Sequence, residues 1–207
     1  MELFLTIAIT HFVALLTPGV DFFLILKTIM QNKINAAKFV CVGIACGNAT
    51  ILLSIYISLF LLGKIGTDIL HYMKYIGAIY LAYLAFQCFY ATRLKNISKD
   101  YLDQSETYLI RGKYWKNLLI GLSSSLLNPK NIMFYSTLVI LIYPKYNLIQ
   151  NLFVSVWMVA VVLFWNLGIV KLLSLKSYII WLQRYIKYLY YLSGFCFSAF
   201  AIILILS

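Results

Sequence analysis

One acidic side chain lies deep inside the first long apolar stretch of this sequence. Asp21 closely follows Thr17, Pro18 and Gly19. A carboxylate in hydrocarbon costs about 2.5 to 3.5 kcal/mol on membrane-insertion scales, so it needs a partner, a water path or a function. We interpret Asp21 as a group that binds and releases a proton or meets the amino group of a solute. The alternative is snorkelling toward the membrane edge, because Lys27 lies only about one and a half turns further along.

A second proline interrupts an apolar stretch in the other half of the chain, within the sequence Asn128, Pro129 and Lys130. Proline has no amide hydrogen, and its ring displaces the carbonyl four residues earlier. The carbonyls freed in this way, those of Ala14 and Ser125, can coordinate a cation. Taken singly, each proline could be a packing kink. Unpaired carbonyls are costly in lipid, so we expect both breaks to face a cavity lined by protein.

Polar residues around the second proline recur at spacings of three and four, which puts them on one helical face. They are Gly121, Ser124, Asn128, Asn131 and Tyr135. Such a stripe should point inward, either to line a pathway or to form hydrogen bonds between helices. Lys130 lies off the stripe, where it either pairs with Asp21 or anchors the carboxylate of a solute.

The composition shows which elements must position these groups. Of 207 residues, 63% are hydrophobic and 11% are charged, whereas soluble domains have about half apolar and a quarter charged residues. Six runs are long enough to cross a hydrocarbon core of about 30 Å. They are residues 3–26, 37–62, 69–90, 117–142, 148–170 and 186–206. We therefore expect an all-α membrane protein with six transmembrane helices.

Basic residues predict the orientation of these helices. The net charge is +11, and most Lys and Arg fall in the first, third and fifth loops, of which residues 92–116 form the longest. Cytoplasmic loops retain basic residues, so both termini are predicted outside a bacterial inner membrane. Anionic lipid headgroups of the bilayer explain the positive charge, and no nucleic-acid partner is expected.

An odd number of helices per half places two similar halves in opposite orientations, an arrangement found in many secondary transporters. Proline breaks at matching positions indicate such inverted three-helix repeats, residues 1–91 and 115–207, within a single domain of 1–207. Four cysteines form no CxxC pair and the two histidines are far apart, so we expect neither a metal site nor a cofactor. Membrane-embedded enzymes need several clustered acid, base or metal-binding groups, so with one buried acid we expect no enzyme.

Four segments together resemble the LysE/RhtB family of amino-acid exporters: TPGVD at 17–21, GxxxG at 43–47, KYIGAIYLAYL at 74–84 and LLNPKNIMFY at 126–135. The resemblance spans essentially the whole chain. It implies export of amino acids or related small metabolites from the cytoplasm, driven by the proton gradient. It also implies that Pro18, Gly19, Asp21, Asn128, Pro129 and Lys130 belong to the transport core. The chain departs from the family at Val20, where a second proline is usual.

We therefore predict a secondary exporter that works by alternating access around a site between the two breaks. Its substrate and proton pathway comprises Thr17, Pro18, Gly19, Asp21, Ser124, Asn128, Pro129, Lys130 and Asn131. The alternatives are an exporter of another small solute, such as a metal cation, and a membrane subunit that transports nothing. A homodimer is a further arrangement left open by the sequence.

Overall fold

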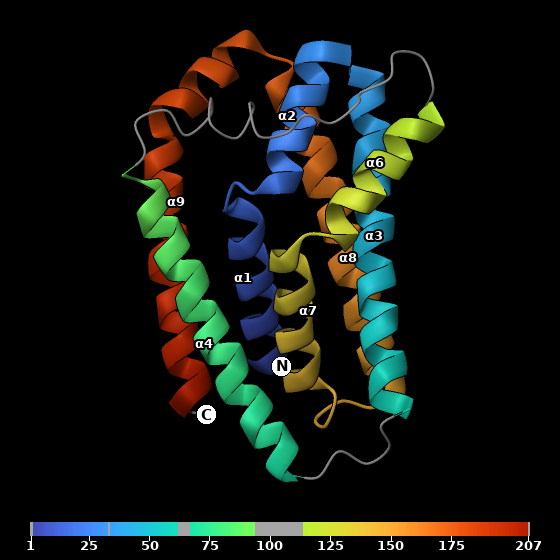
Figure 1. Ribbon diagram of the computed structural model, residues 1–207, viewed down its shortest axis with the longest axis vertical. Helices are drawn as coiled ribbons and strands as arrows, with labels where there is room; N and C mark the ends of the chain where they lie inside the picture. The colour runs from blue at the N-terminus through green and yellow to red at the C-terminus, as the bar shows by residue number, and fades with distance from the viewer. Residues whose placement is uncertain (1, 33, 62–66, 94–113, 207) are drawn as a thin grey trace.

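A computed structural model describes residues 2–32, 34–61, 67–93 and 114–206. Within these ranges the chain forms eight helices and no strand (Figure 1). The helices are α1 (Glu2–Leu16), α2 (Val20–Asn32), α3 (Ile34–Leu61), α4 (Thr67–Ala91), α6 (Tyr114–Leu126), α7 (Pro129–Ile142), α8 (Leu148–Leu173) and α9 (Lys176–Leu206). The all-helical prediction is confirmed. Most of the predicted loop at 92–116 lies outside the described residues.

Two predicted helices are each divided into two at a proline. The first consists of α1 and α2, which meet at an angle of 47° around residues 17–19. The second consists of α6 and α7, separated by Leu127 and Asn128. Figure 1 shows the two breaks at a similar height, near the middle of the molecule. These divided helices thereby bring irregular backbone from both halves into the interior.

Length and hydropathy single out fewer spans than the six predicted. Among the described residues, Ile34–Phe60 and Leu148–Leu173 are long and apolar enough to cross a membrane, and the bent pair of α1 and α2 makes a third if counted as one span. Segments Ala78–Ala91 and Pro129–Ile142 are apolar but shorter. The number six therefore stays a prediction.

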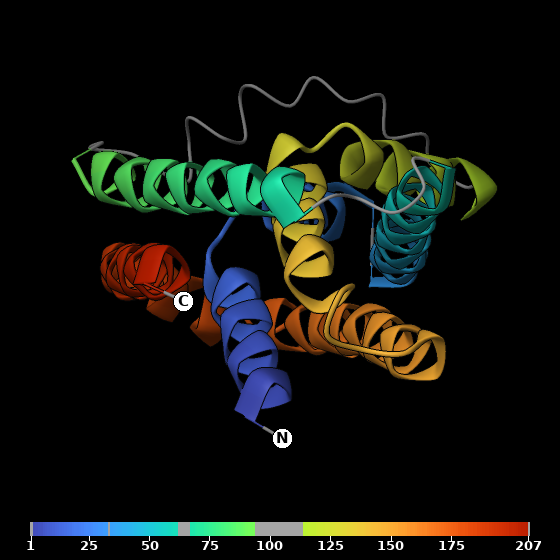
Figure 2. The same cartoon turned by 90° about the horizontal axis from the view of Figure 1, so that it is seen from below.

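The four longest helices flank the divided ones. Helices α4 and α9 pack together on one side, and α3 and α8 pack together on the other (Figures 1 and 2). Helices α1 and α7 lie between these two pairs when the molecule is seen from below (Figure 2). Side chains from all eight helices, including Ile25, Val40, Val139 and Met158, are fully buried or nearly so where these elements meet. The core thus surrounds the breaks.

Glycines allow α3 and α6 to approach closely. A Cβ added at Gly43 would overlap the carbonyl of Leu118, and one added at Gly121 would overlap the carbonyl of Val40. At Gly47 an added Cβ would lie 2.6 Å from Cβ of Ser125. The GxxxG segment at 43–47 therefore serves as a helix-packing surface, as small residues do in membrane proteins.

Helix boundaries differ most from the prediction in α9, which begins at Lys176 rather than Ile186. Its first turns carry Lys176, Arg184 and Lys187 among aromatic residues. A criterion based on apolar length omits such a segment, although basic and aromatic side chains are well suited to a helix end at the membrane surface.

Candidate functional site

Asp21 lies in the first turn of α2, directly after the first break. The N-terminus of a helix carries partial positive charge and exposed amide groups, which favour a carboxylate. Oδ1 of Asp21 accepts a hydrogen bond from Oγ of Ser124 (2.8 Å), and Oδ2 accepts one from Nδ2 of Asn131 (2.8 Å). Both donors belong to the predicted polar stripe, so that stripe faces the carboxylate across the interior.

The hydrogen bonds continue from Asn131 into α3. Nδ2 of Asn131 also donates to Oγ of Ser125 (3.2 Å), and this hydroxyl donates to Oδ1 of Asn48 (2.6 Å). Ser125 and Asn48 are both buried. The network therefore joins α2, α7, α6 and α3. It connects the carboxylate of Asp21 by hydrogen bonds to helices from both halves of the chain.

Lys130 caps the end of α1. Its Nζ donates to the carbonyl of Ala14 (3.0 Å) and to that of Thr17 (3.2 Å). The Ala14 carbonyl is the one that Pro18 frees, because proline cannot donate to it. A cation at a helix C-terminus also interacts favourably with the helix dipole. Between the described residues Lys130 and Asp21 the structure records no direct hydrogen bond, although the two charges are close enough to attract each other.

The second break is a new helix start rather than a kink. Asn128 has extended dihedrals (φ −80°, ψ 107°), and its Oδ1 accepts from the amide of Lys130 (3.0 Å). Pro129 follows as the first residue of α7. An asparagine cap followed by proline is a favoured helix beginning. The carbonyl of Ser125, expected to be free, accepts from the amide of Asn128 (3.2 Å), so that expectation is wrong.

Two tyrosines attach the long helices to the breaks. The hydroxyl of Tyr80 on α4 donates to the carbonyl of Pro129 (3.3 Å), and that of Tyr190 on α9 donates to the carbonyl of Pro18 (3.1 Å). Each tyrosine thus contacts the divided helix of the opposite half of the chain. Neither tyrosine was predicted to belong to the site. Tyr190 is one of several tyrosines beside Lys187, a composition typical of a membrane surface.

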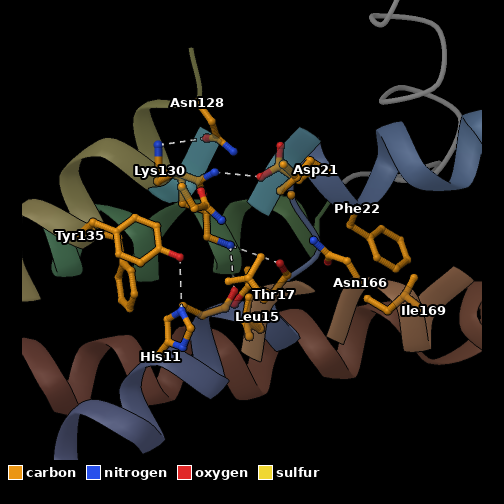
Figure 3. A pocket seen from close by; sticks show the side chains of 17 residues that line it. His11, Leu15, Thr17, Asp21, Phe22, Asn128, Lys130, Tyr135, Asn166 and Ile169 are labelled. Carbon is orange, nitrogen blue, oxygen red and sulfur yellow. Dashed lines mark hydrogen bonds between the residues drawn. The ribbon is translucent and has the colours of Figure 1, made fainter. Parts of the chain in front are cut away.

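A small cavity of about 60 Å³ lies beside Asp21 (Figure 3). Lys130 and Asn131 line it from α7, and His11 lines it from α1. His11 is buried, its Nε2 lies 3.3 Å from the hydroxyl of Tyr135, and its Nδ1 has no hydrogen-bond partner. The cavity has room for a few water molecules or for one small polar group, since one water needs about 10 to 15 Å³ of such volume.

A larger cleft of about 760 Å³ lies between the two breaks and the helices α4 and α9. Thr17, Gly19, Asn128 and Lys130 line both the cleft and the small cavity. A Cβ added at Gly19 would lie 3.6 Å from Nζ of Lys130. The ammonium of Lys130 therefore stands at the boundary between the two spaces.

The structure brings all the predicted site residues together. Thr17, Pro18, Gly19, Asn128, Pro129 and Lys130 line the cleft, Asp21 and Asn131 line the cavity, and Ser124 donates to Asp21. Five further residues that were not predicted line the same two spaces: Asn48, Asn166, His11, Tyr80 and Tyr190. Among the described residues, no group of three or more His, Cys, Asp or Glu could hold a metal ion.

An apolar helical chain with two divided helices around an interior charged site is typical of a membrane translocator. The chain belongs to the LysE type translocator family, which it matches over residues 12–207. It is 25% identical to the threonine efflux protein of Escherichia coli (strain K12), over 100% of this chain and 99% of that protein. It is 29% identical to the leucine efflux protein of Salmonella typhi, over 58% of this chain and 53% of that protein. No solved structure matches it.

Proposed function

We propose that this protein exports amino acids from the cytoplasm in exchange for protons, by alternating access around the two breaks. One observation carries the proposal: Asp21 and Lys130, from two divided helices, line the same interior cavity without a direct hydrogen bond between them. Opposite charges held apart in this way suit a zwitterion, which brings one charge of each sign. Membership of a translocator family whose relatives include threonine and leucine efflux proteins supports the same function.

The packing of the helices supports two inverted three-helix halves. Helix α4 packs on its counterpart α9, and α3 packs on its counterpart α8. Among the divided helices, α2 contacts α8 as its counterpart α7 contacts α3. The two divided helices also run in opposite directions in Figure 1. Six spans in two inverted repeats are therefore the architecture that we propose, and rocking of these halves would open the site to each side in turn.

Exchange requires that the proton and the substrate exclude one another. The small cavity can hold an ammonium group beside Asp21 but not a whole amino acid, and the cleft that shares its wall has room for the remainder. In our proposal the substrate ammonium occupies the cavity, and its carboxylate binds Lys130 at the boundary. A proton on Asp21 removes the negative charge that attracts the ammonium, so the protonated carrier returns empty.

Protonation also changes the hydrogen bonds of Asp21. An ionised carboxylate only accepts, whereas a protonated one donates from one oxygen. The Ser124 hydroxyl can turn to accept that hydrogen, but the Nδ2 group of Asn131 can only donate. We therefore place the proton on Oδ1, where the hydrogen bond to Ser124 can reverse while that to Asn131 is kept.

Vesicles test this proposal directly. Membrane vesicles containing the protein are loaded with a panel of amino acids, and release is measured with and without an inward proton gradient. We expect the gradient to accelerate release, and Asp21→Asn to slow it by at least about a hundredfold through loss of the group that changes protonation. Asp100→Asn, an equivalent change in the predicted cytoplasmic loop, should leave release near the wild-type rate.

Two results would overturn the proposal. Release that ignores the gradient excludes proton coupling. Normal release by Asp21→Asn, inserted in amounts equal to wild type, excludes the carboxylate as the exchanging group. If the wild type releases no amino acid at all, the export function itself is rejected, leaving a subunit that transports nothing or an exporter of another solute.

A further inference from the structure

The cleft between the breaks differs in character from the cavity at Asp21. Lys130 is the only charged residue among the described residues that line it, and it stands at the wall shared with the cavity. The rest of the lining comes mainly from apolar and aromatic side chains, which include Ile79, Tyr83, Leu84, Met133 and Phe197. One end of the cleft can therefore bind a charged group, whereas the other offers an apolar surface.

Polar groups in the apolar part are already paired with one another. The Gln87 amide donates to the hydroxyl of Tyr83, and the Tyr80 and Tyr190 hydroxyls donate to the proline carbonyls. The part of the lining that the structure describes contains no carboxylate to receive a basic side chain, and its one ammonium is needed for the α-carboxylate. A second charge placed here would lose its water without gaining a counter-charge.

The cleft is also open sideways. Ile79 is 70% exposed and Tyr83 is 52% exposed on the surface of the chain. Both residues lie within the apolar helix segment Ala78–Ala91. In a bilayer, exposed side chains of this segment would meet hydrocarbon. An apolar substituent tolerates such surroundings, whereas a charged one is strongly disfavoured there.

We infer that this cleft is the side-chain subsite of the transporter and that it selects neutral amino acids with apolar side chains, from leucine to aromatic size. The inference rests on the proposed export function and adds the substrate class to it. Its volume of about 760 Å³ lies in the range of sites for small molecules, about 300 to 1,000 Å³. The ammonium and carboxylate ends stay at Asp21 and Lys130, so the side chain points toward α4 and α9.

The first test compares substrates with the unaltered protein. Vesicles are loaded with equal concentrations of leucine, phenylalanine, alanine, lysine and glutamate, and initial release rates are measured under one proton gradient. We expect leucine and phenylalanine to leave at least about tenfold faster than lysine and glutamate, a ratio of the size that a hydrophobic pocket achieves. Lysine or glutamate leaving as fast as leucine would reject the apolar subsite while the export function stands.

The second test fills the cleft. Met133→Trp enlarges a cleft-lining side chain. Ile132→Trp makes the same kind of change at the preceding position of α7, which lines neither the cleft nor the small cavity. Both original side chains are 40% exposed, so the pair is matched. We expect Met133→Trp to slow release of leucine and phenylalanine by about tenfold or more and that of alanine less than about threefold. Ile132→Trp should slow none of them.

The pattern across substrates distinguishes the subsite from general damage. Equal slowing of alanine, leucine and phenylalanine by Met133→Trp, or no slowing of any, would overturn the subsite. Absence of release of every amino acid by the wild type would instead reject the proposed export function, and with it this inference. If Met133→Trp does not insert into the membrane, the comparison of lysine and glutamate with leucine in the wild type still decides the matter.

Discussion

At the level of single residues, the site stabilises each buried charge by different groups. The carboxylate of Asp21 receives hydrogen bonds from a hydroxyl and an amide, and the ammonium of Lys130 donates to two carbonyls at the end of α1. Charges that are hydrogen-bonded by neutral groups can stay buried without being paired with each other. In the mechanism that we propose, each charge would exchange a neutral partner for a substrate group of opposite sign.

Removing the Lys130 ammonium should destabilise the break as well as stop transport. Lys130→Met leaves the carbonyls of Ala14 and Thr17 without this donor, and each unsatisfied buried carbonyl costs about 1 to 3 kcal/mol. We expect a lower midpoint of thermal unfolding in detergent. Lys187→Met serves as the control, because Lys187 is exposed and such surface changes usually stay within about 0.5 kcal/mol. Equal unfolding midpoints for the two variants would show that Lys130 does not support α1.

The residues at the breaks could be predicted from sequence, but several of their partners could not. A proline with a nearby charge inside an apolar run is a local signal, which is why Pro18, Asp21 and Lys130 were found. His11, Asn48 and Tyr190 join the site through contacts between distant helices. Their types are ordinary in membrane helices, and nothing in their immediate sequence marks them. The free ring nitrogen of His11 suggests a place in the site only because the structure shows this side chain lining the cavity at Asp21.

At the level of elements, close packing of α3 on α6 determines where the second break lies. Helix α6 can approach α3 only where Gly43, Gly47 and Gly121 expose backbone. This places Ser125 against Asn48 and the end of α6 beside α2. The glycine pattern was recognisable in the sequence, whereas its partner helix was not, because GxxxG segments do not specify what packs on them.

A methyl group at this contact should separate the helices. Gly43→Ala places a carbon where the Leu118 carbonyl lies, so backbone must move, and overpacking of this kind costs about 1 to 3 kcal/mol. Gly168→Ala in α8 meets no atom within 4 Å and should be neutral or stabilising by up to about 1 kcal/mol. Thermal unfolding of the two variants in the same detergent measures the difference. Gly43→Ala as stable as Gly168→Ala would contradict the close approach.

At the level of the whole molecule, α4 packs on α9 and α3 packs on α8, so helices from the two halves of the chain form an extensive interface. The long contacts of α4 with α9 and of α3 with α8 flank the breaks on two sides (Figure 2). Hydropathy alone does not reveal this pairing, because an apolar run marks a candidate span without indicating which other span packs on it. The movement of one half against the other that we propose would change the environment of Asp21 and Lys130 together.

The arrangement of the whole chain predicts its orientation in the membrane. The start of α1 and the end of α9 lie toward the same end of the molecule in Figure 1, and the turn between α7 and α8 lies there too. By the positive-inside rule, the basic residues around the start of α9 predict that the opposite end lies in the cytoplasm. Lys145 between α7 and α8 and Ser177 at the start of α9 are both exposed, and they report on the two ends.

Single cysteines at these two positions distinguish the orientations. In a protein whose four native cysteines are replaced by serine, Lys145→Cys should react with a membrane-impermeant thiol reagent on intact cells, whereas Ser177→Cys should react only after the membrane is permeabilised. Permeabilised cells, in which both cysteines should react, control for the accessibility of each thiol. Labelling of Ser177→Cys on intact cells, with Lys145→Cys protected, would invert the chain. Asp21 would then lie at the outer rather than the cytoplasmic side of its break, and the proton of the exchange would have to reach it by the opposite route.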